Sequence, residues 1–223
     1  MTFLHRTNTF AALWLLTGGI LAVHAQESPV DAGLRAHNLF QSNMVIQRDK
    51  PVVVWGWAKP GHKVTVTFAG ETDSAAADNS GKWTVQLPAM EANSAPAQMT
   101  IVGSGGEKIE FENILIGDVW VLGGQSNMQW GIGGVNEGNL EVVSANFPNI
   151  RMLTVPKIFG PELKTNFPRA AEFSHFTGEE QTAGDWQICS PETVGSMSAI
   201  GYVMARRIHM VSQVPIGIVN TSR

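Results

Sequence analysis

The chain has 223 residues, of which 43% are hydrophobic and 15% are charged, a composition typical of a globular protein and not of a disordered one. Its formal net charge is −4 and like charges do not form runs, which argues against a nucleic-acid partner. Its single cysteine, Cys189, excludes an internal disulfide framework and a cysteine-rich metal site. We expect this thiol to be a small buried side chain, with a reactive thiol as the alternative.

The N-terminus predicts a signal peptide. Arg6 precedes a segment of apolar or small residues over 10–23, and the small residues Val23 and Ala25 occupy the two positions that define a cleavage site. The apolar segment is shorter than the ~20 residues needed to span a bilayer, so we expect cleavage after Ala25 and no membrane association afterwards. Residues 1–25 therefore predict a periplasmic or secreted protein.

Residues 30–113 predict a β-sandwich domain, because short strands follow one another with turn signals and no helical period between them. The expected strands include 51–58, 64–68 and 83–87. Apolar and polar residues alternate in the last two, as in half-buried strands. Tryptophans of this domain either fill its core, as we expect, or expose faces that bind sugar: Trp55, Trp57 and Trp83.

Residues 114–223 predict a second domain, which begins with a buried strand over 116–122. This strand stops at Gly123 and Gly124, and Ser126 follows. A serine in this position can be a nucleophile if its Oγ is exposed, if N–H groups can stabilise an oxyanion and if a base comes from elsewhere. The alternative is a polar turn that only caps the next segment. The Gly-x-Ser-x-Gly elbow is incomplete, because Met128 replaces its second glycine.

The rest of this domain predicts a parallel α/β sheet. A strand over 150–155 precedes an irregular segment over 156–191, and a helix over 196–211 precedes a strand over 214–219. The expected apolar stripe of the helix comprises Met197, Ile200, Met204, Ile208 and Val211. We expect His209 on its solvated face. Catalytic sites of such sheets gather at the carboxyl ends of strands, where Ser126 and Asn220 both lie.

The tetrapeptide Gln-Ser-Asn-Met occurs twice, at 41–44 and at 125–128. Only the second copy follows a buried strand and a Gly-Gly turn. We therefore interpret Ser42 as a turn residue and Ser126 as the candidate nucleophile. An internal repeat is not indicated, because the flanking segments share nothing else.

The phrase Gly-Asp-Val-Trp-Val-Leu-Gly-Gly-Gln-Ser-Asn-Met-Gln-Trp, residues 117–130, resembles the block around the nucleophile of the sialate O-acetylesterase family. These are secreted carbohydrate esterases of the SGNH-hydrolase class. Other segments on both sides of this phrase are similar to the family's in the same order, over about residues 36–223. Upstream these are 39–52 and 55–58, and downstream they are Trp186, Cys189, Pro191, 198–199 and 214–217. The resemblance implies a flavodoxin-like SGNH domain over 114–223, with Ser126 as nucleophile and its backbone N–H as an oxyanion donor.

The resemblance further implies a serine esterase that removes O-acetyl groups from sialic acid or related acetylated glycans, without a cofactor or a metal. We expect Gln125, Asn127 and Asn220 to bind substrate or to brace the turn. The alternative is a non-catalytic secreted module that binds glycans or serves a structural role. The sequence does not indicate the oligomeric state.

The family pattern continues beyond Arg223 with a Gly-Gly-Thr turn, a Gly-Glu-Ser/Ala block and an Asp-x-x-His block that supplies the base. None of these blocks is in the chain. We therefore expect the N-terminal part of a longer esterase, inactive without its catalytic Asp and His. The segment from Glu172 to His175 has an acid-x-x-His spacing, but it precedes the 196–211 helix and so is in the wrong chain order to be that block.

Overall fold

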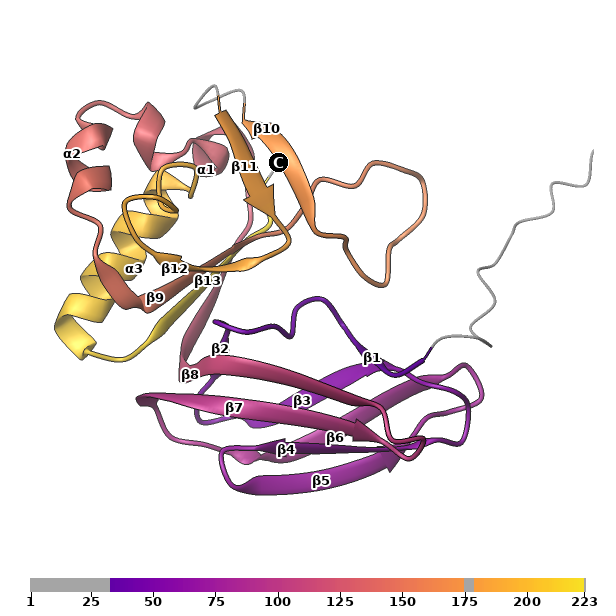
Figure 1. Cartoon of the computed structure of the whole chain (residues 1–223). Helices are drawn as coiled ribbons and strands as arrows, with labels where there is room; N and C mark the ends of the chain where they lie inside the picture. Colours follow the sequence, from indigo (N-terminus) through magenta and orange to yellow (C-terminus); the bar gives the residue numbers. More distant parts are fainter. Residues whose placement is uncertain (1–32, 175–178, 223) are drawn as a thin grey trace, which may run out of the picture.

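The computed structural model describes residues 33–174 and 179–222, so the predicted signal peptide, its cleavage site and His175 lie outside the described residues (Figure 1). The described part consists mostly of strands, with few helices. Its strands are β1 (Arg35–Ala36), β2 (Val45–Gln47), β3 (Pro51–Trp57), β4 (Lys63–Phe68), β5 (Glu71–Ala76), β6 (Lys82–Ala89), β7 (Asn93–Gly103), β8 (Lys108–Leu122), β9 (Phe147–Thr154), β10 (Ala170–Ser174), β11 (Glu179–Ala183), β12 (Trp186–Cys189) and β13 (Ile216–Asn220). Its helices are α1 (Ser126–Gln129), the 3-10 turn η2 (Ile132–Gly134), α2 (Gly138–Val143) and α3 (Ala199–Ser212).

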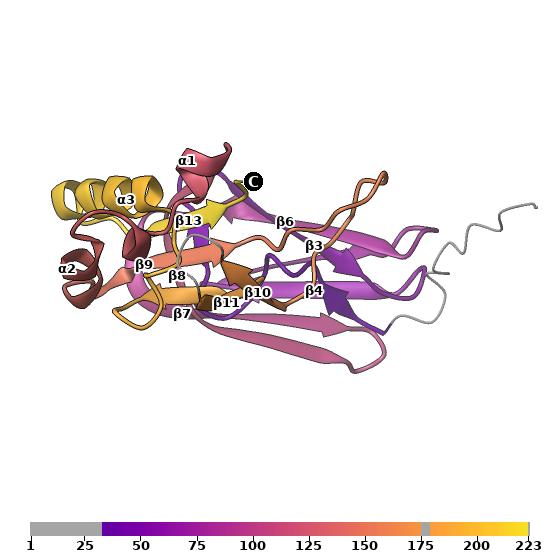
Figure 2. The ribbon, with the colours of Figure 1, turned by 90° about the horizontal axis from the view of Figure 1, so that it is seen from above.

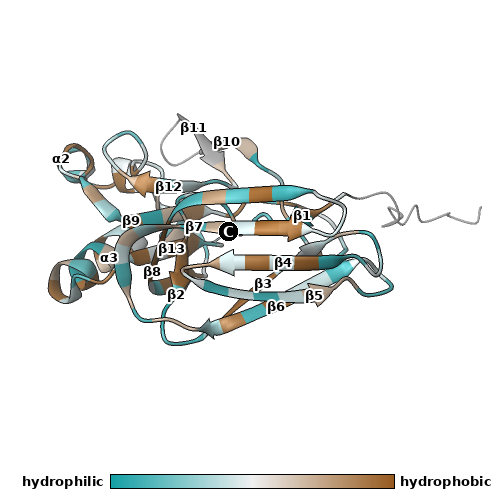
Figure 3. Ribbon diagram, turned by 60° about the horizontal axis from the view of Figure 1, so that its bottom comes forward, coloured by the Kyte–Doolittle hydropathy of each residue, from teal (hydrophilic) through white to brown (hydrophobic). Residues whose placement is uncertain are grey.

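The first half of the described chain folds as two packed layers of strands. One layer is the antiparallel sheet β1-β3-β6, and the other is formed by β5, β4, β7 and the start of β8 (Figure 1). Hydrophobic and hydrophilic residues alternate along these strands (Figure 3). The side chains buried between the layers include Val54, Trp83, Val85, Val64, Val66, Phe68 and Ile101. The alternation predicted for 64–68 and 83–87 is thus confirmed.

The three tryptophans of this half differ in their burial. Trp83 is in the core at 1% exposure, as predicted. Trp55 and Trp57 are only half-buried, and the Arg35 guanidinium lies 5.0 Å from the centre of the Trp57 ring. The core prediction therefore holds fully for Trp83 alone.

The second half is built on a mixed sheet in the order β12-β9-β13-β8, which continues through β8 into β7, β4 and β5. The central strand β13 pairs in parallel with β8 on one side and with β9 on the other, and β12 is antiparallel to β9. Helix α3 covers one face of this sheet, where Tyr202 and Ala205 share a core with Ile216 and Ile218 (Figures 1 and 2). Strand, helix and strand therefore follow each other as predicted.

Strand β8 belongs to both halves, so the predicted domain boundary between residues 113 and 114 lies inside one continuous 15-residue strand. Asn113 has a φ of 56°, which places it in the left-handed region at this point. The buried guanidinium of Arg151 holds the junction: Nη1 donates to the Asn43 and Asn113 carbonyls at 3.1 Å each, and Nε donates to the Pro148 carbonyl at 2.8 Å. Burial lowers the pKa of Arg151 to about 10.

The segment around the first Gln-Ser-Asn-Met copy ties the two halves together. Gln41 is buried, its Nε2 donates to the Gly184 carbonyl at 2.6 Å, and its Oε1 accepts from the Trp186 N–H at 3.2 Å. The Ser42 Oγ accepts a hydrogen bond from the Glu112 N–H at 3.0 Å, which agrees with its interpretation as a turn residue. This copy is therefore structural.

Two predictions of local structure were wrong. The segment 156–191 is not irregular throughout, because it contains β10, β11 and β12. In α3, Ile200 and Val211 are exposed at 53% and 89% instead of buried, and the buried face comprises Gly201, Tyr202, Ala205 and His209. No helix in the described part of the chain is long and apolar enough to cross a membrane.

Candidate functional site

Three strands of the second half end at one edge of the sheet. Asn220, the last residue of β13, pairs with Leu122 at the end of β8 and with Thr154 at the end of β9. Because the three strands are parallel, these are all carboxyl ends, the edge at which α/β sheets place their ligands. Ser126 therefore lies just beyond the end of β8 and Asn220 at the end of the neighbouring β13, as the sequence predicted.

The turn after β8 raises Ser126 above this edge. Gly124 has a φ of 151°, a conformation that side chains rarely adopt, and a Cβ at this position would meet the Met128 Cβ at 3.1 Å. Helix α1 then begins at Ser126. The Ser126 side chain is exposed, and within the described residues its Oγ has no hydrogen-bond partner. A hydroxyl in this state is accessible to a substrate.

Helix α1 is fixed to the body of the protein by the side chains that follow Ser126. The buried Ser198 hydroxyl, at the N-terminus of α3, donates to the Met128 sulfur at 3.3 Å. The Gln129 Nε2 donates to the Ser222 carbonyl at 3.3 Å. These contacts hold one side of α1 against the sheet edge and leave Ser126 and Asn127 exposed.

Two of the other predicted site residues, Gln125 and Asn220, take part in hydrogen bonds within the turns at this edge. The Gln125 carbonyl accepts from the N–H groups of Met128 and Gln129 at 2.8 and 3.1 Å, and the Gln125 side chain is exposed. The Asn220 side chain is buried, and its Oδ1 accepts from the Ser222 N–H at 3.2 Å and from the Ser222 hydroxyl at 2.6 Å. Of the two roles expected for Asn220, bracing the turn is the one that its contacts fit.

Sequence reasoning missed three residues at this edge. Thr221 ties the ends of β13 and β8 together, because its N–H and its hydroxyl both donate to the Leu122 carbonyl at 2.9 Å. Gln129 and Trp130 were read only as part of the matching phrase, although Gln129 anchors α1 and Trp130 presents a half-exposed indole beside it. The four-residue spacing from Ser126 to Trp130, which fits one helical turn, is the sequence signal that could have placed these residues beside the serine.

None of the described histidines is a hydrogen-bond partner of Ser126. His209 is buried, and its Nδ1 lies 2.8 Å from the Val214 carbonyl, so the prediction that it is solvated was wrong. His37 packs among aromatic rings, with its ring centre 5.2 Å from that of Trp55. Glu172 accepts the Lys157 N–H at 2.7 Å. In the described ranges, no group of three or more His, Cys, Asp or Glu residues could hold a metal ion.

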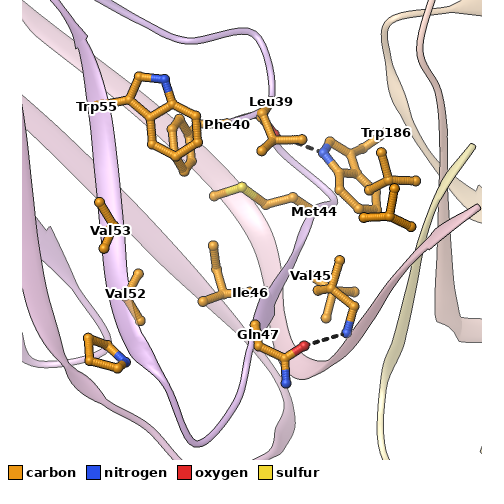
Figure 4. Close-up of a pocket in the computed structure, with 14 residues that line it drawn as sticks. Leu39, Phe40, Met44, Val45, Ile46, Gln47, Val52, Val53, Trp55 and Trp186 are labelled. Carbon is orange, nitrogen blue, oxygen red and sulfur yellow. Dashed lines mark hydrogen bonds between the residues drawn. The ribbon is translucent and has the colours of Figure 1, made fainter. Parts of the chain in front are cut away.

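Two cavities lie away from Ser126. One, of about 340 Å³, is bounded by the segment from Leu39 to Gln47, by β3 and by the face of β8 and β13 opposite α3 (Figure 4). Its described lining contains no acid, base or hydroxyl group, and its amide Gln47 accepts from the Val119 N–H at 2.8 Å. The other, of about 300 Å³, starts at Val155 beyond the end of β9 and includes His37 and Lys164.

Comparison with known proteins finds sialate O-acetylesterases that align with most of the chain. Human sialate O-acetylesterase is 28% identical over 206 residues, an alignment that takes 85% of this chain and 37% of the human protein. The mouse sialate O-acetylesterase is 26% identical over 201 residues, with 85% and 36% covered. The resemblance to sialate O-acetylesterases is confirmed. No family model matches the chain.

The fold gives the same result. A carbohydrate acetylesterase from Xanthomonas citri superposes with a TM-score of 0.74 and 32% identity, over 84% of this chain and 40% of that protein. Over this region the chain thus shares its fold with a carbohydrate acetylesterase of known structure. It spans little more than a third of the length of the curated relatives that it matches.

Proposed function

We propose that this chain is the N-terminal part of a serine esterase that removes O-acetyl groups from sialic acid or a related acetylated glycan. The observation that supports this most is the exposed Ser126 hydroxyl beyond the carboxyl end of β8, inside the phrase that resembles the nucleophile block of the sialate O-acetylesterase family. The proposed substrate, an acetyl ester of a sugar, follows from the names of the similar proteins, sialate O-acetylesterase and carbohydrate acetylesterase. Within this proposal, the second half is a partial SGNH domain and the first half a β-sandwich.

In the proposed reaction, the Ser126 Oγ attacks the acetyl carbonyl and loses its proton to a base. The sugar hydroxyl leaves with a proton, and an acyl-serine remains. Water then attacks this ester, releases acetate and returns the proton to Ser126. In the described chain, the N–H groups of Ser126 and Asn127 donate to no backbone carbonyl, which leaves them available to an oxyanion.

Among the described residues, no histidine that could act as the base is hydrogen-bonded to Ser126. We infer that an imidazole and its carboxylate come from a segment beyond residue 223, in the region that the longer relatives possess. A serine hydroxyl without a base is a weak nucleophile at neutral pH. The 223-residue chain alone is therefore expected to release acetate from an aryl acetate slowly or not at all. We also propose that the signal peptide places the protein in the periplasm or outside the cell.

A fluorophosphonate tests the nucleophile, because it reacts covalently with activated serines. The complete protein should carry one adduct on Ser126, and its Ser126→Ala variant should carry none. Ser42→Ala is the matched control, since Ser42 lies in the other copy of the tetrapeptide and bonds the Glu112 N–H. Rapid acetate release by the 223-residue chain, abolished by Ser126→Ala, would show that the base lies within this chain.

The alternative is a secreted glycan-binding or structural module. The half-exposed Trp55 and Trp57 are the observation in its favour, because exposed aromatic faces suit sugar rings. A module of this kind would bind acetylated glycans and leave Ser126 unlabelled in the complete protein. Labelling therefore separates the two functions.

A further inference from the structure

One tryptophan next to Ser126 is exposed and rigid at the same time. Trp130 follows the last residue of α1, and 42% of its surface is accessible. Its Nε1–H donates to the Gly134 carbonyl at 2.8 Å, and its carbonyl accepts the Ala199 N–H at 2.8 Å. The ring is thus held at both its backbone and its indole nitrogen.

The residues that follow Trp130 add little side-chain cover to its partly accessible ring. Positions 131, 133 and 134 are all glycine, so no side chain from these positions can fold over the indole. The backbone is still ordered there, because the N–H groups of Ile132 and Gly133 donate at 2.9 Å to the carbonyls of Met197 and Gly195. The indole is therefore an aromatic surface on a fixed support.

The position of Trp130 relative to Ser126 is set by one helical turn. The Trp130 N–H donates to the Ser126 carbonyl at 3.1 Å, so the two residues are related as i and i+4. Side chains with this spacing lie on the same face of a helix, with Cβ atoms roughly 5–6 Å apart. The Met128 and Gln129 side chains contact Ser198 and Ser222, whereas Ser126 and Trp130 are both exposed.

We propose that Trp130 is a specificity residue that binds the pyranose ring of the acetylated sugar while Ser126 attacks its ester. The less polar face of a sugar ring carries C–H groups that pack on an aromatic surface. A ring already fixed in place loses little entropy on binding, which favours its use as an anchor. This inference rests on the proposed esterase function, and it names the part of the substrate that this side chain recognises.

Binding measurements on the 223-residue chain test this role without catalysis. The probe is the methyl glycoside of an O-acetylated N-acetylneuraminic acid, titrated by NMR, and ethyl acetate serves as an ester without a sugar ring. Trp130→Ala should weaken binding of the glycoside roughly 3- to 10-fold, the range of one aromatic contact. Trp130→Phe should recover part of the affinity, and ethyl acetate should be unaffected.

Trp120→Ala is the matched control, because Trp120 is 43% exposed and lies on β8 before the turn. It should leave the affinity unchanged. A glycoside that binds wild type and Trp130→Ala equally, or that does not bind wild type, overturns the inference. Failure of Ser126 to react with a fluorophosphonate would instead overturn the esterase function, so the two failures are distinct.

Discussion

Gly117→Ala tests whether the register of β8 and β13, which positions Ser126 and Asn220, depends on one close approach. A Cβ at Gly117 would lie 2.0 Å from the Pro215 carbonyl oxygen and 2.7 Å from its carbon. Real Cβ contacts are essentially never shorter than 3.0 Å, so this backbone must move by at least 1.0 Å. The same carbonyl accepts the Asp118 N–H at 2.9 Å, and such a shift takes it out of hydrogen-bonding range.

The expected cost follows from these contacts. Overpacking costs about 1–3 kcal/mol, and a buried carbonyl left without its donor costs a further ~1–3 kcal/mol. Alanine recovers roughly 0.5–1 kcal/mol in a strand interior because it is less flexible than glycine. The free energy of unfolding should therefore fall by on the order of 3 kcal/mol, and Tm by about 6–12 °C for a chain of this size.

Thermal unfolding followed by circular dichroism measures this change. Gly123→Ala is the control, because a Cβ at Gly123 meets no atom within 4 Å and its Tm should stay within about 2 °C of wild type. If Gly117→Ala were as stable as Gly123→Ala, the close packing of the loop before β13 against β8 would be wrong.

Three further predictions concern groups outside the candidate site. Burial raises the pKa of Cys189 to about 12, so Ellman's reagent should leave it unreacted at pH 8 until the protein is denatured. Burial lowers the pKa of His37 in the folded state, so the protein should lose stability as the pH drops through and below about 6.5. His37→Gln should flatten the fall of Tm between pH 7.5 and 5.5, and an unchanged slope would exclude this role. Gln41→Ala removes the partner of the Gly184 carbonyl and the Trp186 N–H, so urea unfolding should show a loss of about 2 kcal/mol, and no change would mean that this segment is not held by Gln41.

Elements with a clear apolar period were predictable from the sequence, and those without one were not. The alternation in β4 and β6 gave both strands, because every second side chain is buried in one core. Strand β5 was missed because none of its side chains is buried, so its residues carry no period. The sequence of β11, Glu-Glu-Gln-Thr-Ala, is polar for most of its length and gave no strand signal either.

The error in α3 has a steric cause. The prediction followed the three- and four-residue spacing of the apolar residues, whereas the helix meets the end of β8 at a glycine. A Cβ at Gly201 would lie 2.2 Å from the Leu122 Cδ1, so this approach requires glycine. His209 completes the buried face because the Val214 carbonyl lies within hydrogen-bonding distance of its ring. Apolar spacing alone therefore did not identify the whole buried face.

The position of the candidate nucleophile was predictable, and its surroundings were not. A buried strand followed by two glycines and a serine was enough to place Ser126 at the edge of a parallel sheet. The anchoring of α1 by Met128 and Gln129 depends on α3 and on the turn after β13, which lie about 70 and 93 residues further along the chain. Contacts at this separation leave no local signal in the sequence.

The chemistry of Ser126 is tested most directly by mass spectrometry of the complete protein after reaction with a fluorophosphonate. We predict one adduct, located on the peptide that contains Ser126, and retained in the Ser42→Ala variant. An unmodified Ser126 in a folded complete protein that still hydrolyses acetylated sugars would contradict the assignment of this hydroxyl as the nucleophile.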